Sequence, residues 1–507
     1  MSLTYEASSQ LASTLGEAKT YGHFINGEWV DGHSGKEIEL WNPANRQLLG
    51  HIQAGDAVDV DAAVEAAAGA FPSWSRTSAL YRQDVLRQIA AKLRERHLDY
   101  AMLETLNNGK PISEAYGHDV NAAIGQFEYF AGAAFHIDGA LKDFKNSTVL
   151  LHREAIGPVA QIIPWNVALL MASLKLAPAL AAGCTVVLKP AETVCLSVLE
   201  FIKDIADIVP RGVVNVVTGY GADIGQALVG HPNIRKVAFT GSRETARKVM
   251  TYAAQNIIPQ TFELGGKSAN IVCEDADIGA AAASVVQSTI MNKGEVCLAG
   301  TRVFVHQSVH DEFLEKLAKL MTLVRQGDPV DPETNLGAQA SQAQFDKVMS
   351  YIEVGVSEGA TVHAGGVRAH VPGLEDGFFI EPTIFTDVRN DMRIAQEEIF
   401  GPVTDILVWN DEDDMLREVN DSDYGLGGGL WTADLARAHR ISRQMETGTI
   451  WVNRYFNSTI GQSVGGYKQS GFGREGSIET MLDHYTVTKN VVINLAPASE
   501  RIGFRKP

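Results

Sequence analysis

The sequence predicts an α/β fold with two doubly wound open-sheet domains. At 507 residues the chain is too long for one hydrophobic core, so two or three domains are expected. Hydrophobic residues make up 45% and charged residues 21% of the chain, which is ordinary for a globular protein. Short apolar segments alternate with amphipathic ones in two separate stretches. This alternation is typical of parallel sheets whose strands are joined by helices.

The N-terminal region contains a predicted hairpin and two predicted helices. The segment Phe24-Ile-Asn-Gly-Glu-Trp-Val30 places apolar residues on both sides of an Asn-Gly pair, which is a strong hairpin signal. Residues 59–71 are rich in alanine and begin with acidic residues, which favour a helix start because they stabilise the positive end of the helix dipole. Amphipathic spacing predicts a second helix over residues 81–96.

The first stretch of alternating strands and helices begins near residue 159. Its longest apolar segment, residues 168–188, approaches the length of a membrane span, but Lys175, Pro178 and Gly183 interrupt it. A buried helix, a turn and a buried strand explain this segment better. The predicted strands are residues 159–163, 185–188, 213–217 and 236–239, and the predicted helices are residues 197–208, 224–229 and 244–254.

A second alternation follows Gly266 and predicts the second domain. No low-complexity linker separates the two stretches, so residues 263–266 are the best boundary between them. The predicted strands are residues 269–272, 301–305, 404–409 and 449–452, and the predicted helices are residues 280–291, 311–324 and 344–358.

The composition predicts a soluble, cytoplasmic protein. A net charge of −18 disfavours a nucleic-acid partner or an anionic membrane, since either would favour basic patches. No Cys-x-x-Cys pair occurs, which suits a reducing compartment, and no cluster of ligand residues predicts a metal site. The first twenty residues lack a basic stretch followed by an apolar core, so no secretory signal is expected. The four cysteines are Cys184, Cys195, Cys273 and Cys297.

Cys297 is the candidate nucleophile among these cysteines. It follows Lys293-Gly294 in a predicted loop, within the run Glu295-Val-Cys-Leu-Ala-Gly-Thr-Arg302. The other three lie in apolar segments that are predicted to form strands or helices, where inert cysteines usually occur. For any single cysteine a structural role is the default, so motifs elsewhere in the chain decide the interpretation.

Three short segments together supply the groups that cysteine chemistry requires. A thiol nucleophile needs a donor for the alkoxide it creates, and a base for the water that later releases the acyl group. Pro164-Trp-Asn166 offers an amide donor, Glu263-Leu-Gly-Gly-Lys267 a carboxylate, and Cys297 the thiol. In this order, with these flanking glycines, the segments resemble the NAD(P)-dependent aldehyde dehydrogenase family, and the resemblance covers nearly the whole chain.

The resemblance implies roles for five catalytic residues. Cys297 would attack an aldehyde, Asn166 would donate to the resulting alkoxide, and Glu263 would activate the water that hydrolyses a thioester. Lys175 and Glu475 match family positions thought to relay the proton outward. A helix lysine and a surface glutamate are the plainer alternative for that last pair.

The resemblance also implies how the domains are assembled. The dinucleotide-binding domain would comprise residues 20–140 and 158–266, and the catalytic domain residues 267–475. A small β oligomerisation arm would comprise residues 141–157 and 484–507 and would hold together a homodimer or homotetramer. Composition alone would not reveal this arm.

The segment Val187-Leu-Lys-Pro-Ala-Glu192 is the first candidate for cofactor binding. It places Lys189 and Glu192 just past the carboxyl end of a predicted strand, where open α/β sheets bind ligands. A glutamate there can accept both ribose hydroxyls and repels a 2′-phosphate, so NAD is favoured and NADP is possible but less favoured. A surface Lys–Glu pair is the alternative.

Further cofactor contacts are expected along the chain. Phe239-Thr-Gly-Ser242 precedes a predicted helix, so it could bind a pyrophosphate at the helix N-terminus. The Gly-x-Gly-x-x-Gly fingerprint is absent in proper context, but the resembled family binds dinucleotide without it. By resemblance Glu398 would hold the nicotinamide ribose and Phe400 would pack beside the nicotinamide, whereas an acidic turn before a buried strand is the alternative. The full expected set is Ile162, Trp165, Lys189, Glu192, Gly225, Phe239, Gly241, Ser242, Leu264, Glu398 and Phe400.

Four aliphatic residues are the expected substrate contacts: Val167, Leu174, Leu298 and Val464. Val167 stands where the family usually has an aromatic residue, Leu174 where many members have tryptophan, and Val464 where an aromatic residue is usual. Smaller side chains leave more room, so we expect an enzyme that accepts medium-chain or aromatic aldehydes.

Three functions of different classes compete. The first is an NAD-dependent aldehyde dehydrogenase that releases the acid; residues 252–258 and 292–297 most resemble bacterial acetaldehyde dehydrogenases. The second is a coenzyme-A-acylating or semialdehyde-specific enzyme of the same fold. Glu263 disfavours acylation of coenzyme A, because a thiol acceptor needs no water-activating base. The third is a catalytically silent binding protein, which would tend to lose the nucleophile or the base.

Overall fold

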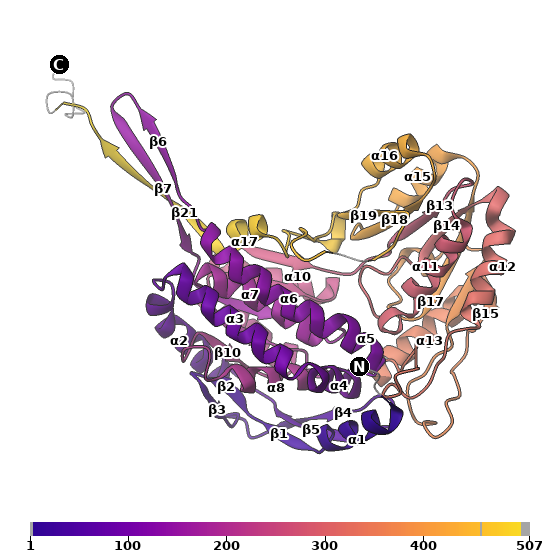
Figure 1. Cartoon of the computed structure of the whole chain (residues 1–507), viewed down its shortest axis with the longest axis horizontal. Helices are drawn as coiled ribbons and strands as arrows, with labels where there is room; N and C mark the ends of the chain where they lie inside the picture. Colours follow the sequence, from indigo (N-terminus) through magenta and orange to yellow (C-terminus); the bar gives the residue numbers. More distant parts are fainter. Residues whose placement is uncertain (1–3, 457–458, 498–507) are drawn as a thin grey trace.

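A computed structural model describes residues 4–456 and 459–497 of the chain. Its first large sheet has eight strands in the order β20-β12-β11-β8-β9-β10-β2-β3 (Figure 1). The five strands from β12 to β10 run parallel and are mostly buried, as expected of strands covered on both faces. The strands are β2 (His23–Ile25), β3 (Glu28–Val30), β8 (Pro158–Ile162), β9 (Thr185–Lys189), β10 (Val214–Val216), β11 (Lys236–Thr240), β12 (Gln260–Glu263) and β20 (Gly471–Phe472).

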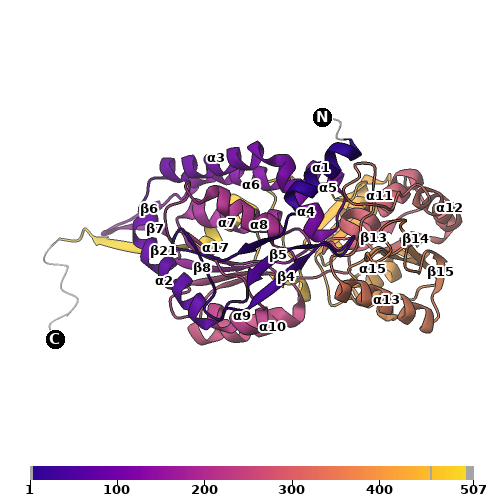
Figure 2. The same cartoon turned by 90° about the horizontal axis from the view of Figure 1, so that it is seen from below.

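Helices cover both faces of this sheet and form a separate core on each (Figure 2). Val60 and Val64 of α2 belong to one core, and Leu176 and Leu180 of α7 belong to the other. The helices on the α2 face are α2 (Ala57–Trp74), α9 (Gly221–Val229), α10 (Arg243–Ala253) and the short η3 (Ala254–Asn256). Those on the α7 face are α3 (Ala79–Glu95), α4 (His97–Asn108), α6 (Val120–Ala133), α7 (Ala168–Ala182) and α8 (Leu196–Ile205), with α5 (Ile112–Glu114), η1 (Ala115–Asp119) and η2 (Ala134–His136) among them.

The second large sheet has seven strands in the order β15-β16-β17-β14-β13-β18-β19, all parallel except the edge strand β15. Helices α11 and α12 pack on one face, and α13, α15 and α16 on the other. The strands are β13 (Ala269–Val272), β14 (Arg302–His306), β15 (Thr361–Ala364), β16 (Thr383–Thr386), β17 (Val403–Trp409), β18 (Gly427–Trp431) and β19 (Thr449–Val452). The helices are α11 (Ile278–Ile290), η4 (Met291–Gly294), η5 (Gln307–Val309), α12 (His310–Met321), α13 (Gln342–Ser357), α14 (Arg393–Gln396), α15 (Glu412–Asn420), α16 (Leu435–Gln444) and η6 (Lys468–Ser470). Helix α17 (Ile478–Tyr485), near the end of the chain, packs instead in the α7 core of the first sheet.

The short strand β20 joins the first sheet from far along the chain. It follows the last strand of the second sheet, yet it pairs antiparallel with β12, so that Phe262 faces Phe472 and Glu263 faces Gly471. The rings of Phe262 and Phe472 lie 5.1 Å apart between centroids. This pairing packs a late segment of the chain against the strand that ends in Glu263.

A three-stranded antiparallel arm extends from the body of the molecule (Figure 1). It consists of β6 (Ala140–Phe144), β7 (Ser147–Ala155) and β21 (Thr486–Asn494), in the order β21-β7-β6. The antiparallel β arm implied by the resemblance is therefore present. The last part of the expected arm, residues 498–507, lies outside the described residues.

Two elements near the N-terminus were not predicted. Helix α1 (Tyr5–Leu15) begins at Thr4, whose side chain accepts the N–H of Ala7. A small sheet is formed by β1 (Lys19–Tyr21), β4 (Glu37–Trp41) and β5 (Leu48–Gln53), in the order β1-β5-β4. Across the described part of the chain, no helix combines the length and the apolar character needed to cross a membrane.

Candidate active site

Cys297 follows a tight turn that begins where helix α11 ends. Asn292 and Lys293 have φ angles of 45° and 62°, in the left-handed region that few residues other than glycine adopt. Gly294 continues the turn at φ 77°, and a side chain there would collide with the backbone of Gly401. Cys297 is partly exposed, whereas the other three cysteines are buried. It is therefore the cysteine most open to a substrate.

The thiol of Cys297 is uncharged at neutral pH. Burial raises its pKa to about 12, and the negative charges of Glu398 and Glu263 act in the same direction. The thiolate is the reactive form of a cysteine, so Cys297 would need a base to take its proton if it acted as a nucleophile.

Glu263 ends strand β12 and carries a carboxylate suited to act as a base. Its Oε1 is buried and has no hydrogen-bond partner within the described residues. Burial raises the pKa of Glu263 to about 8; the charge of Glu475 acts in the same direction, while Lys175 opposes it. A carboxyl group that titrates near neutral pH can both accept and release a proton.

Lys175 and Glu475 form a buried ion pair, although 300 residues separate them. The Nζ atom of Lys175 lies 2.7 and 2.9 Å from the two carboxylate oxygens of Glu475. Both charges influence the pKa of Glu263, so the pair lies near that carboxylate. The structure thus brings three of the five expected catalytic residues together.

Asn166 lies between β8 and α7 with its side chain against the cysteine loop. Its Nδ2 donates a hydrogen bond of 2.9 Å to the backbone oxygen of Glu295, two residues before Cys297. A side-chain amide nitrogen carries two hydrogens, so the second is free for another acceptor. One hydrogen therefore fixes the amide, and the other can serve a bound oxyanion.

A cavity of about 730 Å³ lies at the carboxyl ends of strands β8, β9 and β11. Open parallel sheets bind ligands at this edge. Of the eleven expected cofactor-binding residues, the cavity is lined by the eight residues Ile162, Trp165, Lys189, Glu192, Gly225, Phe239, Gly241 and Ser242.

Two features of this cavity fit an adenosine and a diphosphate. Ser242 caps helix α10 by accepting the N–H of Thr245 at 3.3 Å, so the positive end of that helix opens at the cavity wall. The Glu192 carboxylate lies 3.3 Å from Nζ of Lys189, and both side chains line the cavity. A carboxylate held there can accept hydrogen bonds from the ribose hydroxyls.

The other three expected cofactor residues lie toward the cysteine loop. Phe400 packs edge-on against Trp165, with ring centroids 5.4 Å apart. A carboxylate oxygen of Glu398 accepts the N–H of Gly266 at 3.0 Å, while Leu264 donates its N–H to the backbone oxygen of Ser470.

Gly265 and Gly266 lie where there is no room for a side chain, although their backbone angles are open to other residues. A side chain at Gly265 would begin 2.2 Å from the Glu398 carboxylate, and one at Gly266 would begin 2.5 Å from the backbone oxygen of Cys297.

A comparison of the sequence with protein-family profiles matches one family. The profile described as "Aldehyde dehydrogenase family" matches residues 29–491. The chain belongs to the aldehyde dehydrogenase family. Its members include an aldehyde dehydrogenase of Deinococcus radiodurans, 44% identical over 96% of this chain and 95% of that protein. A probable aldehyde dehydrogenase of Mycobacterium tuberculosis is 45% identical over 96% of each chain.

Solved structures of aldehyde dehydrogenases have the same fold. An aldehyde dehydrogenase of Bacillus cereus in complex with NAD+ is 41% identical, with a TM-score of 0.92 over 96% of this chain and 99% of that one. An indole-3-acetaldehyde dehydrogenase of P. syringae, solved with NAD+ and IAA, is 38% identical, with a TM-score of 0.94 over 97% of this chain and 100% of that one.

Several polar residues of this aldehyde dehydrogenase that were not predicted also line the cavity, among them Gln344 and Lys347 of helix α13. Gln344 Nε2 donates to the backbone oxygen of Phe400 at 2.6 Å. Burial lowers the pKa of Lys347, although Glu398 opposes this. The helix was predicted from its amphipathic spacing, but nothing in that spacing indicates which polar side chains face a ligand.

The four expected substrate residues of the dehydrogenase occupy different elements. Val167 precedes α7, Leu174 lies on α7, Leu298 follows Cys297, and Val464 pairs with Glu475 in an isolated antiparallel bridge. Leu298 packs against an aromatic group, in which the Tyr455 hydroxyl donates to the Leu298 backbone oxygen at 2.8 Å. That group comprises Trp451, Tyr455 and Phe456.

Proposed function

We propose that this aldehyde dehydrogenase oxidises an aldehyde to the carboxylic acid with NAD through a covalent intermediate on Cys297. The observation that carries the proposal is the Glu263 carboxyl group, whose Oε1 is buried without a partner and whose pKa of about 8 responds to the Lys175–Glu475 pair. The NAD+ complexes of the Bacillus cereus and P. syringae enzymes support NAD as the cofactor.

In the first step the sulfur of Cys297 bonds to the aldehyde carbon. The thiol proton passes to Glu263, and the carbonyl oxygen becomes an alkoxide. The free Nδ2 hydrogen of Asn166 and the backbone N–H of Cys297 then donate to that oxygen. A preorganised donor of this kind lowers a barrier by about 3–4 kcal/mol.

In the second step a hydride leaves the carbon, and the thiohemiacetal becomes a thioester. NAD, when bound, supplies the acceptor for this hydride.

In the third step the thioester is hydrolysed. Glu263, once it has released the first proton toward Lys175 and Glu475, removes a proton from water. The water oxygen bonds to the acyl carbon, the carbon–sulfur bond breaks, and the sulfur regains a proton from Glu263. One proton is released overall, and the product is the acid.

Glu192 is proposed to favour NAD over NADP. Its carboxylate lines the cavity beside Lys189, 3.3 Å from that ammonium group. A 2′-phosphate on the ribose would bring about two negative charges next to this carboxylate, and like charges at short range repel each other.

The substrate is proposed to be a medium-chain or aromatic aldehyde. Val167, Leu174 and Val464 are aliphatic, and they supply less bulk than aromatic side chains at the same positions would. The P. syringae relative is an indole-3-acetaldehyde dehydrogenase, and that aldehyde carries an aromatic ring. The segments that resemble bacterial acetaldehyde dehydrogenases, residues 252–258 and 292–297, contain none of the four expected substrate contacts.

The enzyme is further proposed to be a cytoplasmic homodimer or homotetramer. Leu141, Phe144 and Val492 of the arm are between 57% and 64% exposed, and a second copy of the chain would cover such side chains. The four cysteines are free thiols, in keeping with a reducing compartment. The domain limits 20–140, 158–266 and 267–475 remain predictions.

A coenzyme-A-acylating enzyme is the second candidate, and Glu263 disfavours it because such an enzyme needs no activated water. The test is an assay of the purified protein with acetaldehyde, hexanal and benzaldehyde, with and without coenzyme A, that follows the absorbance of NADH. We expect NADH and free acid in the absence of coenzyme A. Activity that requires coenzyme A and yields an acyl-thioester product would replace the proposal.

A further inference from the structure

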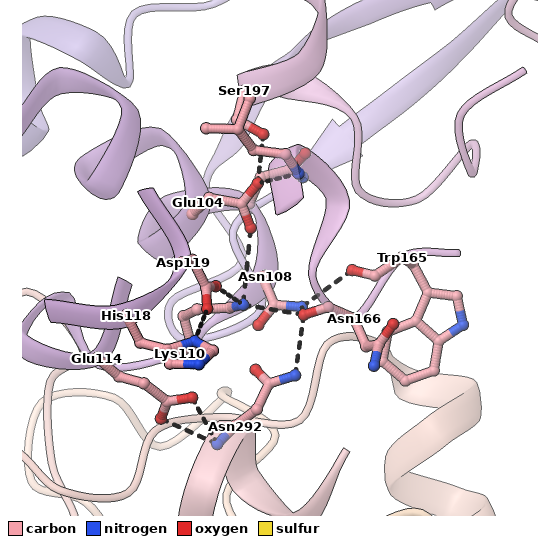
Figure 3. A network of polar contacts seen from close by, with 12 residues as sticks. Glu104, Asn108, Lys110, Glu114, His118, Asp119, Trp165, Asn166, Ser197 and Asn292 are labelled. Carbon is pink, nitrogen blue, oxygen red and sulfur yellow. Dashed lines mark hydrogen bonds and ion pairs between the residues drawn. The ribbon is translucent and has the colours of Figure 1, made fainter. Parts of the chain in front are cut away.

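The main-chain oxygen of Asn166 accepts hydrogen bonds from three buried side chains (Figure 3). Lys110 Nζ and Asn292 Nδ2 each lie 2.9 Å from it, and Asn108 Nδ2 lies 3.4 Å from it. Helix α7 begins only at Ala168, so this oxygen has no partner within a helix. A buried carbonyl needs one donor, and three exceed that requirement.

The Asn292 side chain closes a ring that includes the Asn166 side chain. Asn292 Nδ2 donates both to the Asn166 backbone oxygen and, at 3.0 Å, to the Glu295 backbone oxygen. That same Glu295 oxygen accepts the Nδ2 hydrogen of Asn166 at 2.9 Å. Asn292 therefore holds the main chain of Asn166 together with the acceptor that orients its side-chain amide.

This ring of hydrogen bonds connects the segment after strand β8, which carries Asn166, with the turn that precedes Cys297. Asn166 follows a strand of the first large sheet, whereas Asn292 and Glu295 belong to the turn that leads to Cys297. The Glu114 carboxylate accepts the Asn292 N–H at 2.8 and 2.9 Å, so a second bond from the first half holds the turn. Lys293 adds a third link, because its Nζ contacts both Asn108 and the Glu295 carboxylate.

Lys110 is held by charge rather than by packing alone. Its side chain is fully buried and pairs with the carboxylate of Asp119, while the Glu104 carboxylate lies 3.7 Å away. Burial alone would lower the pKa of Lys110, but these carboxylates outweigh it and keep the pKa above its ordinary value. A permanent ammonium group therefore points at the Asn166 oxygen (Figure 3).

We propose that Asn292 and Lys110 are positioning residues, which hold the Asn166 amide where it can donate to the oxyanion formed on Cys297. This rests on the proposed function, in which Asn166 is the oxyanion donor. Each contacts the Asn166 backbone oxygen and would act on the reaction through Asn166. A shift of about 1 Å in a reacting group can lower a rate by about a hundredfold, so the aim of this amide matters to the chemistry.

The variant that tests the proposal is Asn292→Gly. Glycine keeps the left-handed turn and the N–H that Glu114 accepts, while the Asn166 oxygen retains Lys110 as a partner. Removing Lys110 is less informative, because the paired Asp119 would be left charged and buried. The matched control is Asn215→Ala, which also removes a buried amide nitrogen that donates to two backbone oxygens, those of Val186 and Gly212.

The measurement is the rate of NADH formation in a single turnover, for Asn292→Gly alone and in an Asn166→Ala background. We expect Asn292→Gly to slow this step about 10- to 100-fold, and to change it less than twofold once Asn166 is alanine. NAD affinity and the rate at which iodoacetamide alkylates Cys297 should stay within twofold in all variants. Asn215→Ala should lower the melting temperature without slowing the step.

The outcomes separate the inference from the function on which it rests. An equal slowing by Asn292→Gly in both backgrounds, or a matching loss of Cys297 alkylation, would show that Asn292 supports the cysteine turn and would overturn the inference. Full single-turnover activity of Asn292→Gly would overturn it as well. If Asn166→Ala itself leaves the rate unchanged, Asn166 is not the oxyanion donor, and the proposed function fails at that point together with the inference.

Discussion

Val464 and Glu475 are bound to each other through both backbones: each N–H donates to the other's oxygen at 2.8 Å. Val464 is an expected substrate contact, and the Glu475 carboxylate pairs with Lys175. The expected wall of the substrate site and the expected proton route therefore share one two-residue bridge. A bulky substitution at Val464 would therefore act on the aldehyde through its side chain, while the backbone bridge would keep Glu475 in place.

Replacing Val464 by phenylalanine is expected to narrow specificity toward small aldehydes. The aromatic ring would fill space beside the aldehyde, and such changes are worth about 1–3 kcal/mol per site. The measurement is kcat/KM for acetaldehyde, hexanal and benzaldehyde in both proteins. The wild type should accept hexanal and benzaldehyde at least as well as acetaldehyde. A strong wild-type preference for acetaldehyde that Val464→Phe leaves unaltered would mean that other residues, such as Tyr455 and Phe456, close the site.

Replacing Cys297 by alanine should abolish aldehyde oxidation and leave NAD binding nearly intact. In the proposed mechanism the thiol forms the covalent intermediate, whereas the expected cofactor cavity is lined by other residues. Turnover is followed by NADH absorbance and binding by calorimetry. Cys195→Ala is the matched control: that cysteine is fully buried, so its loss should cost about 1 kcal/mol of stability without slowing turnover. Substantial dehydrogenase activity in Cys297→Ala would rule out the assignment.

Replacing Glu263 by glutamine should separate the two half-reactions. Acylation would still yield NADH, although more slowly because the thiol proton loses its acceptor, and hydrolysis would stall. Intact-protein mass spectrometry should then detect the acyl-enzyme. If no thioester accumulates, and Asn166→Ala alone traps one, the two roles have been assigned the wrong way round.

Hydrolysis of the thioester should accelerate as pH rises through about 8. Burial raises the pKa of Glu263 to about that value, and only the deprotonated carboxylate can act as the base. One pH unit below the pKa, about a tenth of Glu263 is ionised, so the rate should fall about tenfold per unit at lower pH and level off above pH 9. Rapid-quench measurement of thioester decay gives this profile, and a flat profile would contradict the assignment.

Replacing Glu192 by glutamine should reduce the preference for NAD over NADP. The substitution removes the negative charge next to Lys189 but keeps the shape of the side chain and a hydrogen-bonding oxygen. The ratio of kcat/KM values for the two cofactors is the test. A ratio that stays constant, or a wild type that already prefers NADP, would show that Glu192 does not face the ribose.

Eight strands of the two large sheets could be predicted because their residues are mostly apolar: β8, β9, β10, β11, β13, β14, β17 and β19. The strands β12, β15, β16, β18 and β20 were not predicted. Residues 185–188, for example, are fully buried in β9. The small N-terminal sheet could not be predicted, since β1 has three residues of which Lys19 and Thr20 are exposed. The arm strand β6 is exposed along its whole length, so it shows no burial pattern, and only the family resemblance implied it.

The candidate site could be predicted where its residues lie in short motifs, as with Cys297 and Glu263. Contacts between distant segments could not be predicted. Asn292 and Asn166 are 126 positions apart, and nothing local to either residue indicates that they meet. Lys110 lies between Gly109 and Pro111, two residue types that are common in turns. Its neighbours in the sequence therefore suggest an exposed loop, whereas the lysine side chain is buried. The roles of the site residues remain predictions.

The pairing of β20 with β12 also determines when the protein can finish folding during synthesis. Ser470 donates its hydroxyl to the backbone oxygen of Gly265, a residue made 205 positions earlier. Ribosomes add about 5–20 residues per second, so β20 is synthesised roughly 10–40 s after β12, the strand with which it pairs. During that interval the strand that ends in Glu263 has an unpaired edge, to which a strand of another nascent chain could bind. A chain released before Phe472 would never close that edge.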